Sequence, residues 1–218
     1  MLQVIGGLIP IAMAMALSSI PFLATVVVML SPRRTSTAMP YLIGYVGGAF
    51  VAVALANTIL RAVPVRIKLG GAFGIIEVVL GSALIVLAIV QWRIRHRRAA
   101  TNKGWLDRLG KVGPGTVFGF AVALNFRPKS ILLAAAAGVV LARAHLETSQ
   151  SVISLLIYTV VASLTVTIPV VATILHPDAA SAWLIRTHDW LSRNGAIITV
   201  VVLLMVGTTV LGNGLVRL

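Results

Sequence analysis

Long stretches of the chain carry no charged residue. Four of them cover residues 1–32, 35–60, 148–177 and 194–216. Each exceeds the roughly 20 residues that an α-helix needs to cross the hydrocarbon core of a bilayer. A helix is the expected conformation, because every backbone N–H in lipid must find an acceptor within its own segment. The alternating pattern of a membrane β-barrel strand does not occur. We therefore predict an all-α polytopic membrane protein.

Six apolar segments fit this pattern, and we predict six transmembrane helices. We place them at about 4–31, 38–62, 71–92, 115–142, 151–176 and 194–216. The chain 1–218 is then a single transmembrane domain. We divide it into a first three-helix repeat at about 1–92, a basic cytoplasmic loop at about 93–113, and a second repeat at about 114–218.

Composition agrees with this prediction and excludes several classes of function. Hydrophobic residues make up 59% of the chain and charged residues 11%, against about 25% charged residues in an ordinary soluble domain. The net charge of +13 does not indicate a nucleic-acid partner, because the cations lie between apolar segments, as topogenic charges do. The chain has no cysteine, and its histidines lack metal-ligand spacing. We expect no metal and no cofactor.

Positive charge is unevenly distributed among the connections. Placing the N-terminus outside puts Arg33, Arg34 and two basic connections, 93–113 and 178–193, on the inner side. Because Lys and Arg accumulate in cytoplasmic loops, we predict that both termini lie outside. The helically spaced apolar residues of 178–193 predict a short helix in the membrane interface.

The first and fourth segments share a pattern around a proline. Ala16-Leu17 precedes Pro21 in the same way that Ala123-Leu124 precedes Pro128, 107 residues later. Three helices per half would make the two repeats inverted in the membrane. Paired helices interrupted by proline in inverted repeats are the best pointer to the binding site of a transporter. We predict that helices one and four are broken.

Two cations lie midway through the fourth segment, on either side of Pro128. Arg127 and Lys129 each cost about 2.5–3.5 kcal/mol at the bilayer centre, unless they face a polar cavity, an anion or a carboxylate. Groups freed at a helix broken by proline bind ligands or ions in transporters. We interpret the pair as a site for an anionic headgroup or carboxylate near the midplane, faced by Ser18 and Ser19. Alternatively, both charges snorkel to the cytoplasmic interface.

Glu77 is the acidic residue within the apolar segments, and it lies in the outer half of segment three. An intramembrane carboxylate is a candidate for proton coupling or for pairing with a buried cation. The alternative is that Glu77 lies near the helix end and reaches water at the outer surface.

Segment five carries hydroxyl groups at helical spacing, on Thr159, Ser163 and Thr167. They line a cavity or form hydrogen bonds between helices. The pairs Gly44/Gly48 and Gly115/Gly119 predict close helix packing. The predicted substrate-binding and translocation residues are Ser18, Ser19, Pro21, Asn125, Arg127, Pro128, Lys129, Thr159, Ser163 and Thr167.

Several stretches resemble one family. Segment one ends in Ser31-Pro32-Arg33-Arg34, Gln91-Trp92-Arg93 precedes the basic loop, and residues 124–133, 163–166 and 194–198 extend the similarity. On these residues, over nearly its whole length, the chain resembles the sulfolipid- and glycopeptidolipid-addressing (GAP/Sap-type) proteins of the lysine-exporter (LysE) superfamily. The resemblance implies a six-helix protein of the bacterial inner (plasma) membrane that helps to export envelope lipids. It also implies membrane lipids, a homodimer or a larger lipid-export machinery as partners.

The chain departs from the superfamily at segment four, where the usual pattern is Asn-Pro-Lys. Here Phe126 and Arg127 separate Asn125 from Pro128-Lys129. The two extra residues turn Asn125 by roughly 200° around an ideal helix. Arg127 is an added cation, which suits an anionic lipid headgroup.

We expect a secondary transporter or exporter of an envelope lipid or glycolipid with an anionic or polar headgroup. It would work by alternating access or by a lateral groove around segments one and four. Two alternatives stay open, namely an exporter of small solutes such as amino acids or cations, and a non-transporting scaffold for a lipid-export complex. We expect no enzyme, because the sequence shows no nucleophile–base pair and no P-loop.

Overall fold

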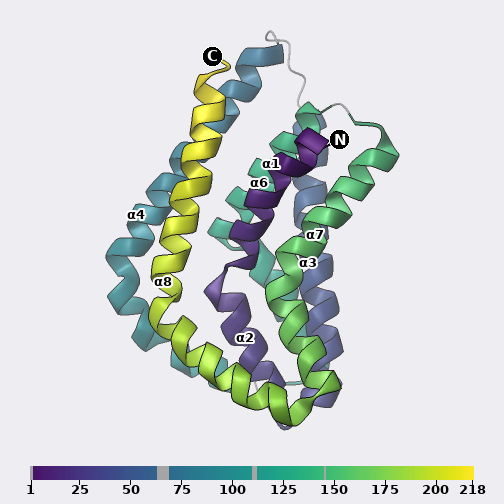
Figure 1. The fold of residues 1–218 in the computed structure, drawn as a ribbon, viewed down its shortest axis with the longest axis vertical. Coiled ribbons are helices and arrows are strands. Elements are labelled where there is room, and N and C mark those ends of the chain that lie inside the picture. The colour runs from purple at the N-terminus through teal and green to yellow at the C-terminus, as the bar shows by residue number, and fades with distance from the viewer. Residues whose placement is uncertain (1, 63–68, 110–111, 145) are drawn as a thin grey trace.

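The computed structural model describes residues 2–62, 69–109, 112–144 and 146–218, and helices dominate them (Figure 1). In chain order the elements are α1 (Leu2–Ala16), α2 (Ser19–Met29), α3 (Arg34–Ala62), α4 (Leu69–Leu109), α5 (Pro114–Ala123), the 3-10 helix η1 (Leu124–Phe126), α6 (Pro128–Arg143), α7 (Thr148–Leu175) and α8 (Pro177–Leu215). No strand occurs in these ranges, so the all-α prediction is confirmed.

Four of the described helices are long and apolar enough to cross a membrane. They are α3, α7, Phe73–Ile94 within α4 and Arg193–Leu215 within α8. Two bent pairs pass the same test together, α1 with α2 (53°) and α5–η1 with α6 (63°), so the number rises to six if each pair is one span. The prediction that segments one and four are broken helices is confirmed. The inverted repeat stays a prediction.

Two connections differ from their predicted form. The backbone of α4 stays helical to Leu109, so most of the stretch predicted as a loop at 93–113 continues the preceding helix. The side chains of 95–111, which carry most of its cations, lie outside the described side chains. The connection at 178–193 is the first part of α8 rather than a separate short helix, and it runs obliquely before α8 turns into its span (Figure 1).

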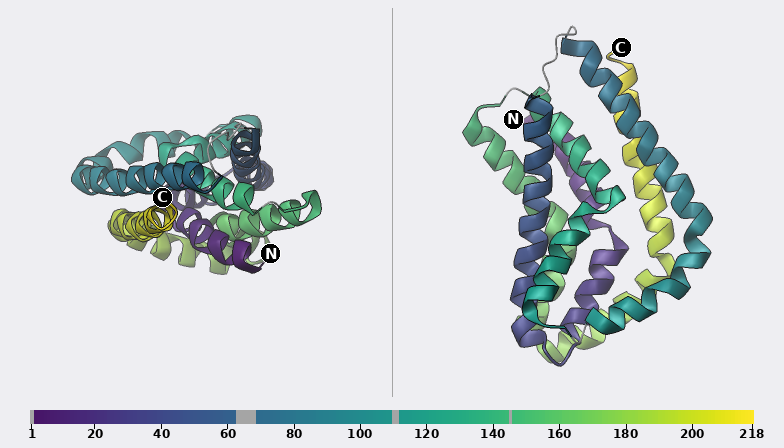
Figure 2. Two further views of the ribbon diagram at one scale, coloured as in Figure 1. Left: turned by 90° about the horizontal axis from the view of Figure 1, so that it is seen from above. Right: turned by 180° about the vertical axis from the view of Figure 1, so that it is seen from behind.

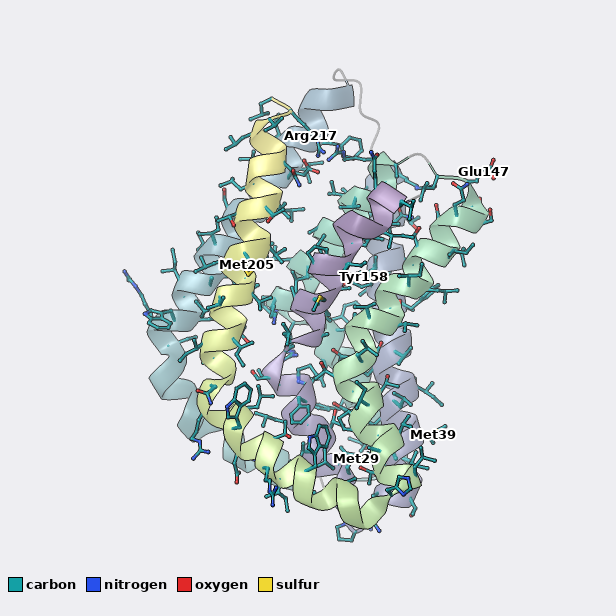
Figure 3. The ribbon with its side chains drawn as sticks, viewed as in Figure 1. Met29, Met39, Glu147, Tyr158, Met205 and Arg217 are labelled. Atoms are coloured by element: carbon teal, nitrogen blue, oxygen red, sulfur yellow. The ribbon has the colours of Figure 1, made fainter. Side chains whose placement is uncertain are left out.

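Both chain termini lie at the same end of the molecule (Figures 1 and 2). Figure 3 places Glu147 and Arg217 at this end, which we call the terminal end, and Met29 and Met39 at the opposite end. The α2–α3 connection follows Met29 directly and ends in Arg33, and Arg34 begins α3, so we call the opposite end the basic end. An even number of crossings explains why the termini share one end. Which end faces the cytoplasm stays a prediction.

Apolar side chains form two main cores, one towards each end. The core at the terminal end joins α1, α6 and α7 to parts of α4 and α8, with Leu133, Leu141 and Leu203 fully buried. The core at the basic end joins α2, α3 and α5 to the second half of α7 and the start of α8. The two cores are divided at the level of the two helix breaks, where polar groups are buried instead.

Helices α4 and α8 contact each other more extensively than either contacts any other helix, and they run side by side (Figure 2). Glycines bring the two backbones together. A Cβ on Gly81 would lie 2.5 Å from the backbone nitrogen of Leu211, and one on Gly214 would lie 2.8 Å from the carbonyl oxygen of Gly74. We call the α4–α8 pair the arm. It was not predicted from the sequence, although glycines seven residues apart on both helices were the available signal.

Only one of the two predicted glycine pairs packs closely. A Cβ on Gly44 would lie 2.7 Å from the carbonyl oxygen of Phe118, so α3 lies directly against α5. A Cβ on Gly115 or on Gly119 would meet no described atom within 4 Å. The prediction of close packing is therefore confirmed for Gly44/Gly48 and wrong for Gly115/Gly119 within this chain.

Candidate functional site

The break before α6 follows from Pro128. The residue before a proline avoids the helical region, and Arg127 is extended at φ −77°, ψ 155°. Pro128 then occupies the first helical position, where its missing N–H costs nothing. The carbonyl of Leu124, which would have accepted that N–H, instead accepts from Arg127 Nε at 3.0 Å and from Ser130 Oγ at 3.3 Å.

A proline also explains the break between α1 and α2, although it lies at a different position in the helix. Pro21 is the third residue of α2, and its missing N–H would leave the carbonyl of Leu17 without a donor in a continuous helix. The chain is extended at Ser18, with φ −89° and ψ 114°. The carbonyl of Ala16, at the end of α1, accepts a hydrogen bond from Thr165 Oγ1 of α7. At each helix break, therefore, one carbonyl accepts a hydrogen bond from a side chain.

A cavity of about 150 Å³ lies between the two breaks. Its lining comes from α2, α4, α6 and α8 and the extended residues before α2 and α6, and consists of Ser18, Ser19, Ile20, Leu87, Gln91, Arg127, Pro128, Lys129 and Thr199. The cavity is midway along the two bent pairs. Relative to α4 and α8 it is nearer the basic end, since Gln91 is close to Ile94 and Thr199 is close to Arg193, where those two spans end. We call it the break cavity.

Lys129 is the most informative residue of the break cavity. It is 9% exposed, and its Nζ has no hydrogen-bond partner among the described residues. The snorkelling alternative is wrong for Lys129, because the side chain is buried beside the cavity rather than extended to the surface. Arg127 differs, since part of its guanidinium bonds the carbonyl of Leu124 while the residue lines the cavity.

Five predicted site residues lie outside the cavity lining, and two of them, Asn125 and Pro21, lie at the breaks. Asn125 is fully buried and donates from Nδ2 to the carbonyls of Tyr45 (3.1 Å) and Ala121 (3.2 Å), which holds η1 against α3. Pro21 is buried, and its carbonyl accepts from Tyr41 Oη at 2.9 Å and from Thr25 Oγ1 at 2.8 Å. These residues shape the breaks without facing the space between them.

The hydroxyl groups of α7 are arranged differently from either expectation. Thr159 and Ser163 are buried and donate to carbonyls of their own helix, at Leu155 and Thr159. Such bonds neither line a cavity nor join helices. Thr167 is half-buried and is not part of the break cavity. Two other hydroxyl groups of α7 join helices, because Thr165 Oγ1 donates to the carbonyl of Ala16 in α1 and Ser151 Oγ accepts from Arg61 Nη2 of α3. Neither was assigned a role from the sequence.

Glu77 forms an ion cluster at the terminal end. It is 4% exposed. Its Oε1 accepts from Arg143 of α6, and its Oε2 lies 2.7 Å from Arg217 Nη1, beyond the end of α8. The alternative that Glu77 reaches water is therefore wrong, and pairing with cations is what the structure shows. Glu77 also lines a second, mostly apolar cavity of about 130 Å³ between α1, α6 and α8.

Four residues of the break cavity were not predicted from the sequence, which are Ile20, Leu87, Gln91 and Thr199. Gln91 offered a signal, as a polar residue at the end of an apolar run. Ile20, Leu87 and Thr199 offered none, because their place depends on how the arm packs against the two breaks.

The sequence matches one known family over nearly its whole length. A family model described as Sap, sulfolipid-1-addressing protein, matches residues 8–216. This range includes both helix breaks and every residue that lines the break cavity. No curated protein and no solved structure gives a significant match.

Proposed function

Because the chain belongs to the family of Sap, sulfolipid-1-addressing proteins, we propose that it exports an envelope lipid or glycolipid with an anionic headgroup. The substrate would cross the bacterial inner membrane unchanged, without a catalysed reaction. The observation that carries this proposal is Lys129, a buried cation without a partner among the described residues, in a cavity between two broken spans. Burying an ammonium group is unfavourable unless an anion compensates it.

The size of the break cavity supports a headgroup rather than a whole lipid as its occupant. Pockets that enclose drug-sized ligands measure about 300–1,000 Å³, whereas the break cavity measures about 150 Å³. Acyl chains would remain in the bilayer while the headgroup enters between the breaks. The arm contributes Gln91 and Thr199 to the lining, so its boundary with the other helices is the proposed lateral entrance.

In this proposal the basic end faces the cytoplasm, because Arg34, Arg93 and Arg193 lie at the ends of the spans there. Arg33, in the connection before α3, lies at the same end. The headgroup site then lies nearer the cytoplasmic ends of the spans in α4 and α8. That position suits loading from the inner leaflet. A homodimer or a larger export machinery would be the partner in the cell.

Reconstituted lipid movement tests the proposal. The full chain is placed in proteoliposomes that carry phosphatidic acid labelled with a fluorophore on its acyl chain, and dithionite bleaches the outer leaflet. We expect movement of the inner-leaflet label, slowed about tenfold or more by Lys129→Ala, since a charge-assisted contact contributes about 1.5–3 kcal/mol. Arg93→Ala is the matched control, because Arg93 is exposed at the basic end.

Other results would contradict the proposal in different ways. Movement of a labelled amino acid or cation without movement of the lipid would indicate the small-solute exporter. No movement of either, by a chain that is inserted and folded, would indicate the scaffold. Equal rates for wild type and Lys129→Ala would show that the cavity does not carry the headgroup.

A further inference from the structure

Two half-helices begin at the break cavity. Helix α2 has 11 residues and starts after Ser18, and α6 has 16 residues and starts after Arg127. Both starting residues line the cavity. Neither side chain forms a capping hydrogen bond to the first turn that follows it.

The first-turn amides of these helices are therefore available to a ligand. Ser19 and Ile20 in α2, and Lys129 and Ser130 in α6, have no carbonyl one turn earlier in their own helix. Each helix start also carries a partial positive charge of about half a unit. Two such starts at one cavity form a site that attracts negative charge.

Two carbonyl groups at the same breaks are already occupied. Those of Ala16 and Leu124 already accept hydrogen bonds, from Thr165 and from the side chains of Arg127 and Ser130. These two acceptors are therefore used within the protein, while the first-turn amides stay available to the cavity. Among the described residues that line the cavity, none is acidic.

Lys129 is an independent observation that points to a ligand. Its Nζ is buried without a partner among the described residues, and the residue lines the same cavity. Hydroxyl groups of Ser18, Ser19 and Thr199 add donors from α8 as well as from the first break. The donors thus belong to three helices, α2, α6 and α8, and to the extended residue before α2.

We propose that the break cavity binds a tetrahedral oxyanion, the sulfate or phosphate group of an ester. This inference rests on the proposed export function and names the chemistry of its headgroup. The oxygens of such a group point in different directions, which matches donors on α2, α6 and α8. Lys129 supplies the charge, and the two helix starts supply the amides.

Binding of short alkyl esters tests the proposal directly. Octyl sulfate, octyl phosphate and octanoate share one chain length, and each is titrated by calorimetry into the full chain in a non-ionic detergent. We expect both esters to bind at least about tenfold more tightly than octanoate. Octanoate binding as tightly as the esters would overturn the preference for a tetrahedral group.

Variants at Lys129 place the site. Lys129→Met should weaken binding of octyl sulfate about tenfold or more, Lys129→Arg should retain most of it, and Arg93→Ala should leave it unchanged. Unchanged binding by Lys129→Met would overturn the site. Because Met is of similar size and removes an unpaired buried charge, the thermal midpoint without ligand should not fall. A lower midpoint would show that Lys129 has a partner in the protein, which overturns the proposal.

Inorganic sulfate and phosphate identify the source of the oxyanion. Either ion binding as tightly as its octyl ester would support the oxyanion site and overturn its assignment to a lipid. Tight ester binding by a chain that moves no lipid in proteoliposomes would likewise retain the site and contradict the export function. The two proposals therefore fail in distinguishable ways.

Discussion

Two charged residues, Glu77 and Lys129, are buried in the described part of the apolar helices, and they differ in how their charge is compensated. At the terminal end, Glu77 is buried with Arg143 and Arg217 as partners. At the helix breaks, Lys129 is buried to a similar degree, and its Nζ has no partner in the described part of the chain. Both groups lie where the arm meets the other helices.

The two places differ in what compensates the buried charge. Glu77 joins α4 to α6 and to the end of α8, so its charge is compensated by the fold itself. Lys129 gains no such compensation from the described residues, and in our proposal a ligand from outside the chain supplies it. Partners, rather than depth in the membrane, distinguish the two roles.

The largest expected effect comes from breaking the ion cluster. Glu77→Gln leaves Arg143 and Arg217 facing each other without a counter-charge. Both arginine side chains are partly exposed, at 26% and 36%, so we expect a loss of about 2–3 kcal/mol, at or below the low end of the range for a buried pair. Thermal unfolding in detergent measures it. Glu147→Gln is the control, since Glu147 is exposed at the same end. Equal thermal midpoints for Glu77→Gln and Glu147→Gln would contradict a structural role for the Glu77 ion cluster.

The same variant tests proton coupling, which stays a prediction for Glu77. A coupling carboxylate must release and take up a proton during transport, so Glu77→Gln should abolish any pH dependence of lipid movement in proteoliposomes. Retained pH dependence in a folded Glu77→Gln protein would assign Glu77 to the structure alone.

A smaller loss of stability should follow from moving Arg217 away from Glu77. A Cβ on Gly214 would lie 2.8 Å from the carbonyl oxygen of Gly74, so Gly214→Ala pushes the end of α8, and with it Arg217, away from Glu77. We expect a loss of about 1–2 kcal/mol from this overpacking. Gly212 has nothing within 4 Å of its Cβ position, and Gly212→Ala should be neutral or stabilising. If both variants unfold alike, the arm is not held by glycine contacts.

The smallest effect concerns the breaks themselves. Thr165→Val removes the hydroxyl that satisfies the carbonyl of Ala16, which should cost about 1 kcal/mol. Thr159→Val removes a hydroxyl whose acceptor, the carbonyl of Leu155, keeps its place in the ladder of α7, so the loss should be smaller. Thermal midpoints of both variants measure the difference. A larger loss of stability for Thr159→Val than for Thr165→Val would mean that the carbonyl of Ala16 needs no donor from the protein.

The spans and breaks could be predicted because their causes are local. Runs without charge determine where helices cross, and Pro128 determines its break through the residue before it. Proline alone is not sufficient, since Pro10, Pro40 and Pro169 lie inside α1, α3 and α7 without ending them. The repeated pattern in segments one and four was the additional signal.

The candidate site was predictable only in part, because its remaining members depend on packing between distant segments. Ser18, Arg127 and Lys129 are adjacent to the breaks and were found. Thr199 lies in an ordinary apolar helix, and the arm alone brings it to the cavity. Asn125 was assigned to the cavity from its motif, but its side chain bonds the backbone of α3.

The backbone contact within the arm limits how this molecule can change shape. Where glycines let two main chains touch, there are no side chains to rearrange, and sliding would force atoms into one another. Helices α4 and α8 should therefore move together as one rigid body, and the hinge should lie where the arm meets the other helices. The chain has no native cysteine, so cysteine pairs introduced for cross-linking would form disulfides only with each other. A cross-link within the arm should leave activity intact, whereas one from α4 to α6 should lock it.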